Sequence, residues 1–404
     1  MLELFPKLGA GCVLRLRVAV LTLRGGGEQS AARMTSSRTQ ILALNLVLAT
    51  AFSASALAQK LEIGNLAYEK NPPYPEEQNP QLPLQVYDDE FAEILGTEPK
   101  LIHLAKGFGF AEGPVYLQVK NSPEGYLVFT DQINDNINLI RWHGLSPYNT
   151  ITPISWSEPV IFRHPSSIAD GQTADLESRL LTAETTGRRV SITHHDGRVE
   201  TLAGSYDGKP LNSPNDLVVK SDGSVWFTDP SYGSLQFPQE AELPNNVYRY
   251  DPATKKLTVV TGDLQMPNGI AFSPDEKTLY IIDSGAIQSP RTYYYNKPHT
   301  IYAFDVAPDG KTVSNQRVFA VVYPGFPDGM RLDEQGNVYS GALDGIHVFN
   351  PKGKMIGKIQ LPKQTANLTF GGRDNNILFI CSSDSVWAIK LNTKGAKPVP
   401  QIDR

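Results

Sequence analysis

One short pattern recurs six times along the chain and limits the folds that the chain can adopt. Each copy contains a polar motif, a strand, a turn and a second strand, as in LNSPNDLVVKSDGSVWFTD (211–229) and MPNGIAFSPDEKTLYIIDS (266–284). The copies lie about 40 to 60 residues apart, which is the period of β-propeller blades. The sequence therefore predicts an all-β, six-bladed β-propeller. The polar motif positions are Glu112, Asp170, Asn215, Asn268, Asp328 and Asn367.

The repeats set the expected boundaries of the propeller. Each repeat has room for about four short strands, as NNVYRYDPATKKLTVVT (245–261) illustrates. We expect the propeller to span residues 101–395, with a short tail over 396–404. The stretch KLIHLA (100–105) is expected to close the ring by pairing with the last blade. Residues 59–100, which include a Pro-rich polar run, are expected to wrap around the surface.

The first 58 residues do not resemble part of this fold. From Met34 the chain has an n-region with Arg38, an apolar stretch from Ile41, and the small-residue site Ala56-Leu57-Ala58. We interpret residues 1–58 as a leader with a secretory signal that is cleaved after Ala58, the true start being Met34. A transit-type leader is the alternative. The protein is expected to be secreted.

Charge and cysteine content exclude several function classes for the mature chain. Without the leader, 31 Lys and Arg face 40 Asp and Glu, a net charge of −9 that is unfavourable for binding nucleic acid. Only Cys381 remains, so no internal disulfide can form. Beyond the leader, no apolar stretch approaches the roughly 18 residues of a membrane span. We expect neither nucleic acid nor a membrane as a partner.

Equivalent positions of propeller blades lie on a circle around the central channel, so the motif side chains should converge at one mouth. Turns are an alternative explanation, because Pro-Asn and Asp-Gly sequences often initiate them. Each repeat, however, already has a separate turn between its strands, for example at Asp222-Gly223 and Gln335-Gly336. The motifs are additional to those turns, which favours a site in the channel.

The residue types at the motifs indicate the kind of ligand. Two carboxylates and two amides supply hard oxygen ligands, and the two negative charges balance a divalent cation. Calcium suits this set, whereas zinc favours His or Cys, which no motif contains. We expect one calcium ion in the channel, other divalent metals being possible. The expected ligands are Glu112, Asn215, Asn268 and Asp328.

Four segments of the chain form a recognisable set: FAEGPVY (110–116), LNSPNDLVVKSDGSVWFTDPSYG (211–233), MPNGIAFSPDEKTLYIID (266–283) and GFPDGMRLDEQGNVY (325–339). They resemble the four signature segments of the gluconolactonase, regucalcin and fungal lactonohydrolase family. With NLTFGG (367–372), the resemblance covers roughly residues 105 to 390. It implies a calcium-containing six-bladed propeller that hydrolyses an ester or lactone, with the same four metal ligands.

One departure from the family pattern concerns the second blade. Many members have Ala-Asn-Gly where this chain has Ala169-Asp170-Gly171. The additional carboxylate disfavours acidic substrates and makes gluconolactone itself less certain as the substrate. We assign Asp170, Asn215 and Asn367 to substrate binding.

The expected reaction is the opening of a sugar-acid-type or related lactone to its hydroxy acid. The cation would stabilise the oxyanion that forms when water attacks the carbonyl carbon. A carboxylate must accept the proton of that water; Asp328 is the first candidate and Asp216 the second. Two alternatives remain: a phosphotriesterase that uses the same metal centre, and a non-catalytic propeller that binds ligands.

Overall fold

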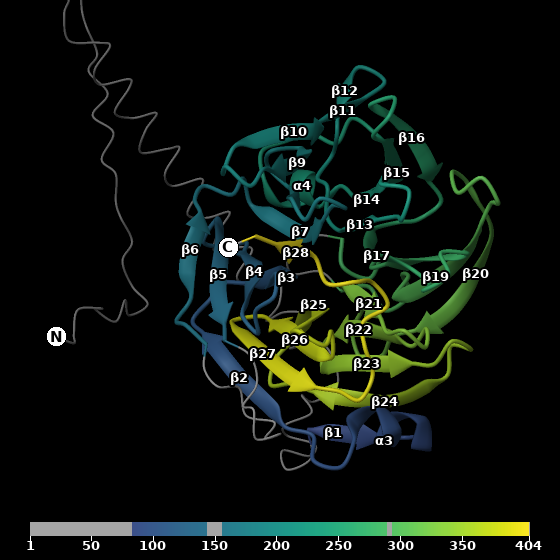
Figure 1. Ribbon diagram of the computed structural model, residues 1–404. Helices are drawn as coiled ribbons and strands as arrows, with labels where there is room; N and C mark the ends of the chain where they lie inside the picture. The colour runs from purple at the N-terminus through teal and green to yellow at the C-terminus, as the bar shows by residue number, and fades with distance from the viewer. Residues whose placement is uncertain (1–82, 144–155, 289–292, 404) are drawn as a thin grey trace, which may run out of the picture. The chain divides into compact units, whose positions relative to one another are not determined.

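The computed structural model describes residues 83–143, 156–288 and 293–403. The proposed leader and the Pro-rich run lie outside these residues. Within them, six sheets of four or five strands are arranged around a common axis, as Figure 1 shows. The innermost strands of neighbouring sheets contact one another all the way around, so they form a closed ring. The prediction of a six-bladed all-β propeller is confirmed.

Within each blade, the strands follow one another in sequence order from the channel outward. Blade 1 contains β3 (Ala111–Val119), β4 (Gly125–Asp131), β5 (Asn136–Trp142) and β6 (Val160–Arg163); blade 2 contains β7 (Ala169–Ala174), β8 (Leu180–Glu184), β9 (Arg189–Thr193) and β10 (Val199–Ala203); blade 3 contains β13 (Leu217–Val219), β14 (Val225–Asp229), β15 (Asn246–Asp251) and β16 (Lys256–Thr261).

The remaining blades follow the same order. Blade 4 contains β17 (Pro267–Phe272), β18 (Thr278–Asp283), β19 (Thr300–Val306) and β20 (Val313–Val321); blade 5 contains β21 (Met330–Leu332), β22 (Val338–Ala342), β23 (Gly345–Phe349) and β24 (Met355–Gln360); blade 6 contains β25 (Thr365–Gly371), β26 (Ile377–Ser382) and β27 (Ser385–Lys390). A hairpin of β11 (Ser205–Tyr206) and β12 (Lys209–Pro210) and the short helix α4 (Tyr232–Gln236) lie outside this scheme.

Blade 6 takes its outermost strand from the beginning of the propeller. Strand β2 (Leu101–Lys106) pairs antiparallel with β27, with Leu101 opposite Ile389 and Lys106 opposite Ser385. This pairing confirms that the KLIHLA stretch closes the ring. At the other end of the chain, β28 (Gln401–Ile402) pairs parallel with β3 in blade 1.

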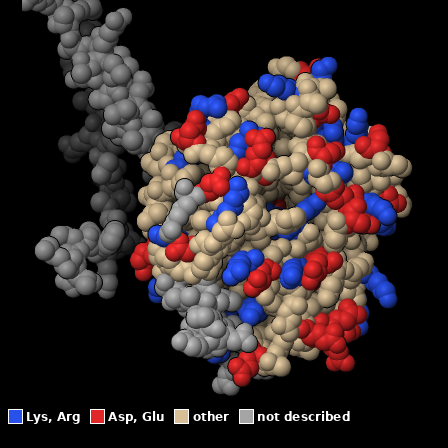
Figure 2. Space-filling model, in the orientation of Figure 1, with Lys and Arg blue, Asp and Glu red and all other residues tan. Residues whose placement is uncertain are grey.

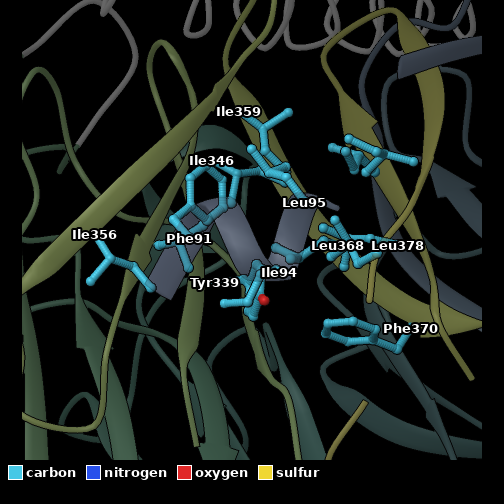
Figure 3. Close-up of a cluster of buried hydrophobic side chains, with 14 of the residues drawn as sticks. Phe91, Ile94, Leu95, Tyr339, Ile346, Ile356, Ile359, Leu368, Phe370 and Leu378 are labelled. Carbon is cyan, nitrogen blue, oxygen red and sulfur yellow. The ribbon is translucent and has the colours of Figure 1, made fainter. Parts of the chain in front are cut away.

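The segment before the closing strand contains a helix that the sequence analysis did not predict. Strand β1 (Leu84–Val86) extends blade 5 beside β24, and α3 (Asp89–Leu95) follows it. Asp88 caps the helix by accepting a hydrogen bond from the backbone N–H of Glu90, and Gly96 ends it with a φ of 75°. As Figure 3 shows, Phe91, Ile94 and Leu95 pack into the hydrophobic cluster between blades 5 and 6.

The middle strands of the blades are buried on both faces because each blade lies between two others. Strand β26 is an example, since all six of its residues, Ile377–Ser382, are buried. Aromatic rings fill the seams between blades: Tyr116 of blade 1 stacks on Phe379 of blade 6, with ring centroids 5.1 Å apart. Radial packing of this kind supplies the core that a single blade lacks.

Candidate metal and hydrolase site

Each motif residue lies at the start of an innermost strand or just before it. Glu112, Asp170, Asn268 and Asn367 are near the start of β3, β7, β17 and β25. The pair Asn215 and Asp216 directly precedes β13, and Asp328 lies two residues before β21. The regular register of the blades thus brings residues that are far apart in the sequence to one end of the channel.

Buried carboxylates at the ends of the second strands hold the motif loops in place. In three blades, an aspartate accepts hydrogen bonds from two backbone N–H groups of the loop that leads to the motif, at 2.8 to 3.1 Å. These aspartates position the backbone and leave the motif side chains free to face the channel. The groups are Asp131 with Gly109 and Phe110, Asp229 with Asn212 and Ser213, and Asp283 with Gln265 and Met266.

Glycines next to the motif residues allow neighbouring blades to approach closely. A Cβ atom on Gly113, whose φ is +52°, would lie 2.2 Å from the carbonyl oxygen of Asp170. A Cβ atom on Gly329 would lie 2.1 Å from the side chain of Asn367. Neither position can accept a side chain without displacing the next motif, so the glycine that follows many of the motif residues is needed for the ring to close.

Each carboxylate at this mouth is held by an amide from another blade. Asn215 Nδ2 donates to Asp170 Oδ2 at 2.9 Å, and Asn367 Nδ2 donates to Glu112 Oε1 at 2.7 Å. Asp328 has two such partners, because Asn268 Nδ2 donates to Oδ1 at 2.9 Å and Gln364 Nε2 to Oδ2 at 3.0 Å. Neutral amides orient these carboxylates but do not neutralise them.

The negative charges at the mouth therefore raise one another's pKa. Burial is the largest cause of the raised pKa of Glu112, and the carboxylates of Asp328 and Asp170 add to it. Burial, and then Asp170, raises the pKa of Asp328 to about 8. Both effects disfavour the charged form of the carboxyl groups. A cation placed among them would relieve this repulsion.

A cavity opens at the same mouth. Among the described residues, those that line it include no Lys, Arg or His. Glu112 Oε2 is buried there and has no hydrogen-bond partner among the described residues. The walls of the cavity are formed by Phe110, Glu112, Gln132, Asp170, Thr185, Tyr232, Gln236, Asn268, Ile287, Phe326, Asp328 and Gln364.

The oxygen chemistry of this mouth fits a hard divalent cation. The orphaned Glu112 Oε2 is a ligand atom without a partner, and Asp328 contributes a second negative charge. Among the described residues, no three His, Cys, Asp or Glu side chains form a cluster that could hold a metal ion by themselves. A cation here would need the amides of Asn215 and Asn268 as further ligands, and each could present its oxygen after rotation of the amide group.

Asp216 occupies a different environment from the carboxylates that line the cavity. Its Oδ2 forms an ion pair with Arg331 Nη1 at 3.4 Å, and its Oδ1 accepts a hydrogen bond from the backbone N–H of Leu217 at 2.9 Å. Its side chain is 2% exposed and is not among the described residues that line the cavity. Arg331 thus offsets part of the charge of Asp216, which still makes a small contribution to the raised pKa of Glu112 and of Asp328.

The structure brings some of the predicted site residues to the cavity and keeps others behind it. Glu112, Asp170, Asn268 and Asp328 line the cavity. Asn215 lies beside Asp170, and Asn367 is fully buried behind Glu112, where its Oδ1 accepts a hydrogen bond from Leu368 N. With both amide ends engaged, Asn367 positions Glu112.

Several wall residues were not identified in the sequence. Phe110, Ile287 and Phe326 form an apolar part of the wall, and Gln132, Gln236 and Gln364 add amides. All six lie outside the β-strands. Two signals were available. Phe110 and Phe326 each lie two residues before a motif residue, and Gln364 lies three residues before Asn367, where Gln265 lies before Asn268.

Comparison with known proteins places the chain in a family. Residues 110–384 match the family described as SMP-30/Gluconolactonase/LRE-like region. A gluconolactonase of Zymomonas mobilis is 30% identical over 318 residues, which cover 75% of this chain and 84% of that protein. Lactonohydrolase oryL of Aspergillus oryzae is 33% identical over 213 residues, 50% of this chain and 49% of that one.

Solved structures agree with this match. A gluconolactonase from Xanthomonas campestris superposes with a TM-score of 0.62 at 31% identity, covering 76% of this chain and 95% of that chain. A calcium-binding regucalcin from Agrobacterium tumefaciens, at 17% identity and a TM-score of 0.54, covers 77% of this chain and 96% of its own and shares the fold. The matched region is more than half of the chain and contains all six motif positions. The chain therefore belongs to the SMP-30/Gluconolactonase/LRE-like family.

Proposed function

We propose that the protein is a calcium-dependent lactonohydrolase that opens a sugar-acid-type or related lactone to the hydroxy acid. The relatives named above are a gluconolactonase and a lactonohydrolase, and membership of their family makes the protein a hydrolase of carboxylic ester bonds. Calcium dependence and the class of lactone are our inference. The observation that carries it is the unpaired, buried Glu112 Oε2 in a cavity with further carboxylates on its wall.

The residues that would hold the ion are Glu112, Asn215, Asn268 and Asp328. Their carboxylate and amide oxygens are the ligands that calcium prefers, and water and substrate would complete the shell. When bound, the ion would supply positive charge that polarises the lactone carbonyl and favours the charge of the oxyanion. The same charge would offset the repulsion that raises the pKa of Glu112.

Asp328 is the residue that we propose as general base. It lines the cavity, and amides from two blades hold both of its oxygens, so its carboxylate has a fixed direction. A bound cation would lower the pKa that burial raises in the metal-free protein, so the assignment rests on this geometry and not on that pKa. Asp216 is less suitable, because Arg331 engages it away from the cavity.

The proton of the attacking water would pass to an oxygen of Asp328 as the water oxygen bonds to the carbonyl carbon. Cleavage of the ring C–O bond then frees the alcohol oxygen, which takes the proton back from Asp328, so the hydroxy acid forms and the carboxylate is regenerated. The apolar wall of Phe110, Ile287 and Phe326 would limit bulk water around the reacting ring. Small-molecule sites usually combine a few polar groups with apolar ones in this way.

Acid release from lactones tests the proposal directly. The purified protein is freed of metal with a chelator, and hydrolysis of gluconolactone, pantolactone and an aromatic lactone is followed in a pH-stat with and without added calcium. We expect hydrolysis of at least one lactone only when calcium is present. A phosphotriester serves as the comparison substrate. Equal activity with and without calcium, or turnover of the phosphotriester alone, would contradict the proposal.

A further inference from the structure

We propose that Gln364 selects the substrate by accepting a hydrogen bond from a hydroxyl on the carbon next to the lactone carbonyl. The inference rests on the proposed lactonohydrolase function, and it names a specificity-determining residue of that site. It predicts that the preferred substrates are 2-hydroxy lactones.

Gln364 is fixed in place on the segment between β24 and β25. Its side chain lines the cavity, yet the residue is only 5% exposed. The amide Nε2 donates to Asp328 Oδ2 at 3.0 Å, and the backbone carbonyl accepts a hydrogen bond from Ser383 Oγ at 3.1 Å. Both the backbone and the amide nitrogen are therefore anchored.

The other end of the amide is not satisfied. Gln364 Oε1 is buried and has no hydrogen-bond partner among the described residues. The contrast with Asn367 is informative, because that amide uses its nitrogen on Glu112 and its oxygen on the N–H of Leu368. Buried polar atoms are nearly always hydrogen-bonded, so an orphan acceptor in a cavity wall indicates a donor that arrives with the ligand.

The chemistry of the acceptor determines which group of the substrate it can bind. An amide oxygen accepts a hydrogen bond and cannot bind a carbonyl or ring oxygen, so the partner must be a hydroxyl. Gln364 bonds to the same carboxylate that would receive the proton of the attacking water. The reacting carbon lies next to that carboxylate, so the nearest substrate hydroxyl is the one on the adjacent carbon.

The apolar residues that line the same cavity are compatible with this orientation. The aromatic rings of Phe110 and Phe326 and the side chain of Ile287 supply apolar contact surface. A lactone ring can place its C–H groups on this surface while its carbonyl and neighbouring hydroxyl face the carboxylate and amide groups. Small-molecule sites typically combine an apolar wall with a few convergent polar groups that fix orientation.

Two small lactones that differ only in this hydroxyl test the inference. We would measure kcat/KM of the calcium-loaded enzyme for α-hydroxy-γ-butyrolactone and γ-butyrolactone, and the ratio of the two values is the readout. The wild-type enzyme should favour the hydroxy lactone. In Gln364→Met, which keeps the length of the side chain, the ratio should fall roughly 10- to 100-fold, mainly through KM of the hydroxy lactone.

A second variant separates the acceptor role of Gln364 Oε1 from the hydrogen bond that Nε2 donates to Asp328. Gln364→Glu keeps an oxygen acceptor but replaces the donor to Asp328 with a second acceptor. We expect it to lower kcat for both lactones while the ratio stays close to that of the wild type. The matched control is Gln316→Met, which makes the same substitution at an exposed glutamine on β20, outside the cavity, so the ratio should not change.

Binding provides a readout that does not depend on turnover. The ring-opened products, 2,4-dihydroxybutyrate and 4-hydroxybutyrate, would be titrated into the calcium-loaded protein by calorimetry. The wild type should bind the 2-hydroxy acid more tightly, and Gln364→Met should bind the two alike. An unchanged ratio and unchanged product binding in Gln364→Met would overturn the role of Gln364. If the wild type hydrolyses neither these nor any other lactone, the proposed function itself fails.

Discussion

Asp328 and Asp216 are both buried aspartates at channel ends of inner strands, but their surroundings differ. The side chain of Asp328 accepts hydrogen bonds from two neutral amides, and burial with neighbouring carboxylates raises its pKa to about 8. Asp216 has the guanidinium of Arg331 at 3.4 Å, which lowers a pKa that burial raises. Glu184 in blade 2 resembles Asp216, because Arg163 and Arg189 both pair with it. A buried carboxylate whose charge is not balanced is the better candidate for cation binding and catalysis.

The strongest test of this comparison is to remove the charge of each aspartate in turn. Asp328→Asn keeps an oxygen in the site but abolishes proton abstraction, so turnover should fall about 10²- to 10⁴-fold. Asp216→Asn is the matched control, and its kcat at saturating substrate and calcium should stay within about tenfold of the wild type. Steady-state lactone hydrolysis measures both. The reverse pattern would assign the role of base to Asp216.

The ion pair between Asp216 and Arg331 should contribute to the free energy of unfolding. Arg331→Met leaves the 2% exposed side chain of Asp216 without its counter-charge, which we expect to lower the free energy of unfolding by about 2–4 kcal/mol. Urea denaturation measures the change. In the double variant with Asp216→Asn, much of that loss should be restored, because no buried charge is left unpaired. A loss as large in the double variant would show that the pairing is not its cause.

Calcium affinity should respond to the unbalanced carboxylates alone. Glu112→Gln removes one of the two negative charges of the proposed ligand set, so the dissociation constant for calcium should rise by about tenfold or more. Isothermal calorimetry of the metal-free protein gives this value. Asp216→Asn removes the same charge outside the cavity and should change it far less. Wild-type affinity in Glu112→Gln would refute the ligand assignment.

The pH dependence of the metal-free protein tests the raised pKa of Asp328 itself. The pKa of Asp328 is raised from 3.8 to about 8, so between these values the folded state holds a proton that the unfolded chain has released. This stabilisation is complete below about pH 4 and is lost as the pH rises toward 8, with a slope of at most about 1.4 kcal/mol per pH unit.

Denaturation with urea in the presence of a chelator, at pH 5, 6.5 and 8, measures that slope. Asp328→Asn should flatten it, and saturating calcium should remove it from the wild type. The raised pKa would be contradicted if the free energy of unfolding of the wild type rose with pH over this range and Asp328→Asn abolished that rise.

The repeat was sufficient to predict the six blades, the closing strand and the convergence of the motifs, because blade register depends on local strand and turn patterns. It could not predict the partner of Asp216, since Arg331 belongs to another blade and has no special position in the motif. Gln364 and the apolar wall were missed for a related reason. They lie in connecting segments, whose side chains acquire a role only when the ring closes.

The predictions about the leader stay predictions, because residues 1–58 lie outside the described residues. Helix α3 was missed because its seven residues are too few to give a strong periodic signal. Its apolar positions at Phe91, Ile94 and Leu95 can be understood only with the cluster that they cover. Among the described residues, no helix is long and apolar enough to cross a membrane.

The pairing of β2 with β27 joins the first strand of the propeller to the last strand of blade 6. Leu101 meets Ile389, so the contact that joins blade 6 to the start of the propeller spans nearly its whole sequence. During synthesis the first five blades can emerge and pair internally, but the ring cannot close until β27 has left the ribosome. Folding is therefore expected to be slow, as for other topologies of high contact order. A chain that terminates before Ser385 would leave β2 without its partner strand and expose the edge of β26 to aggregation.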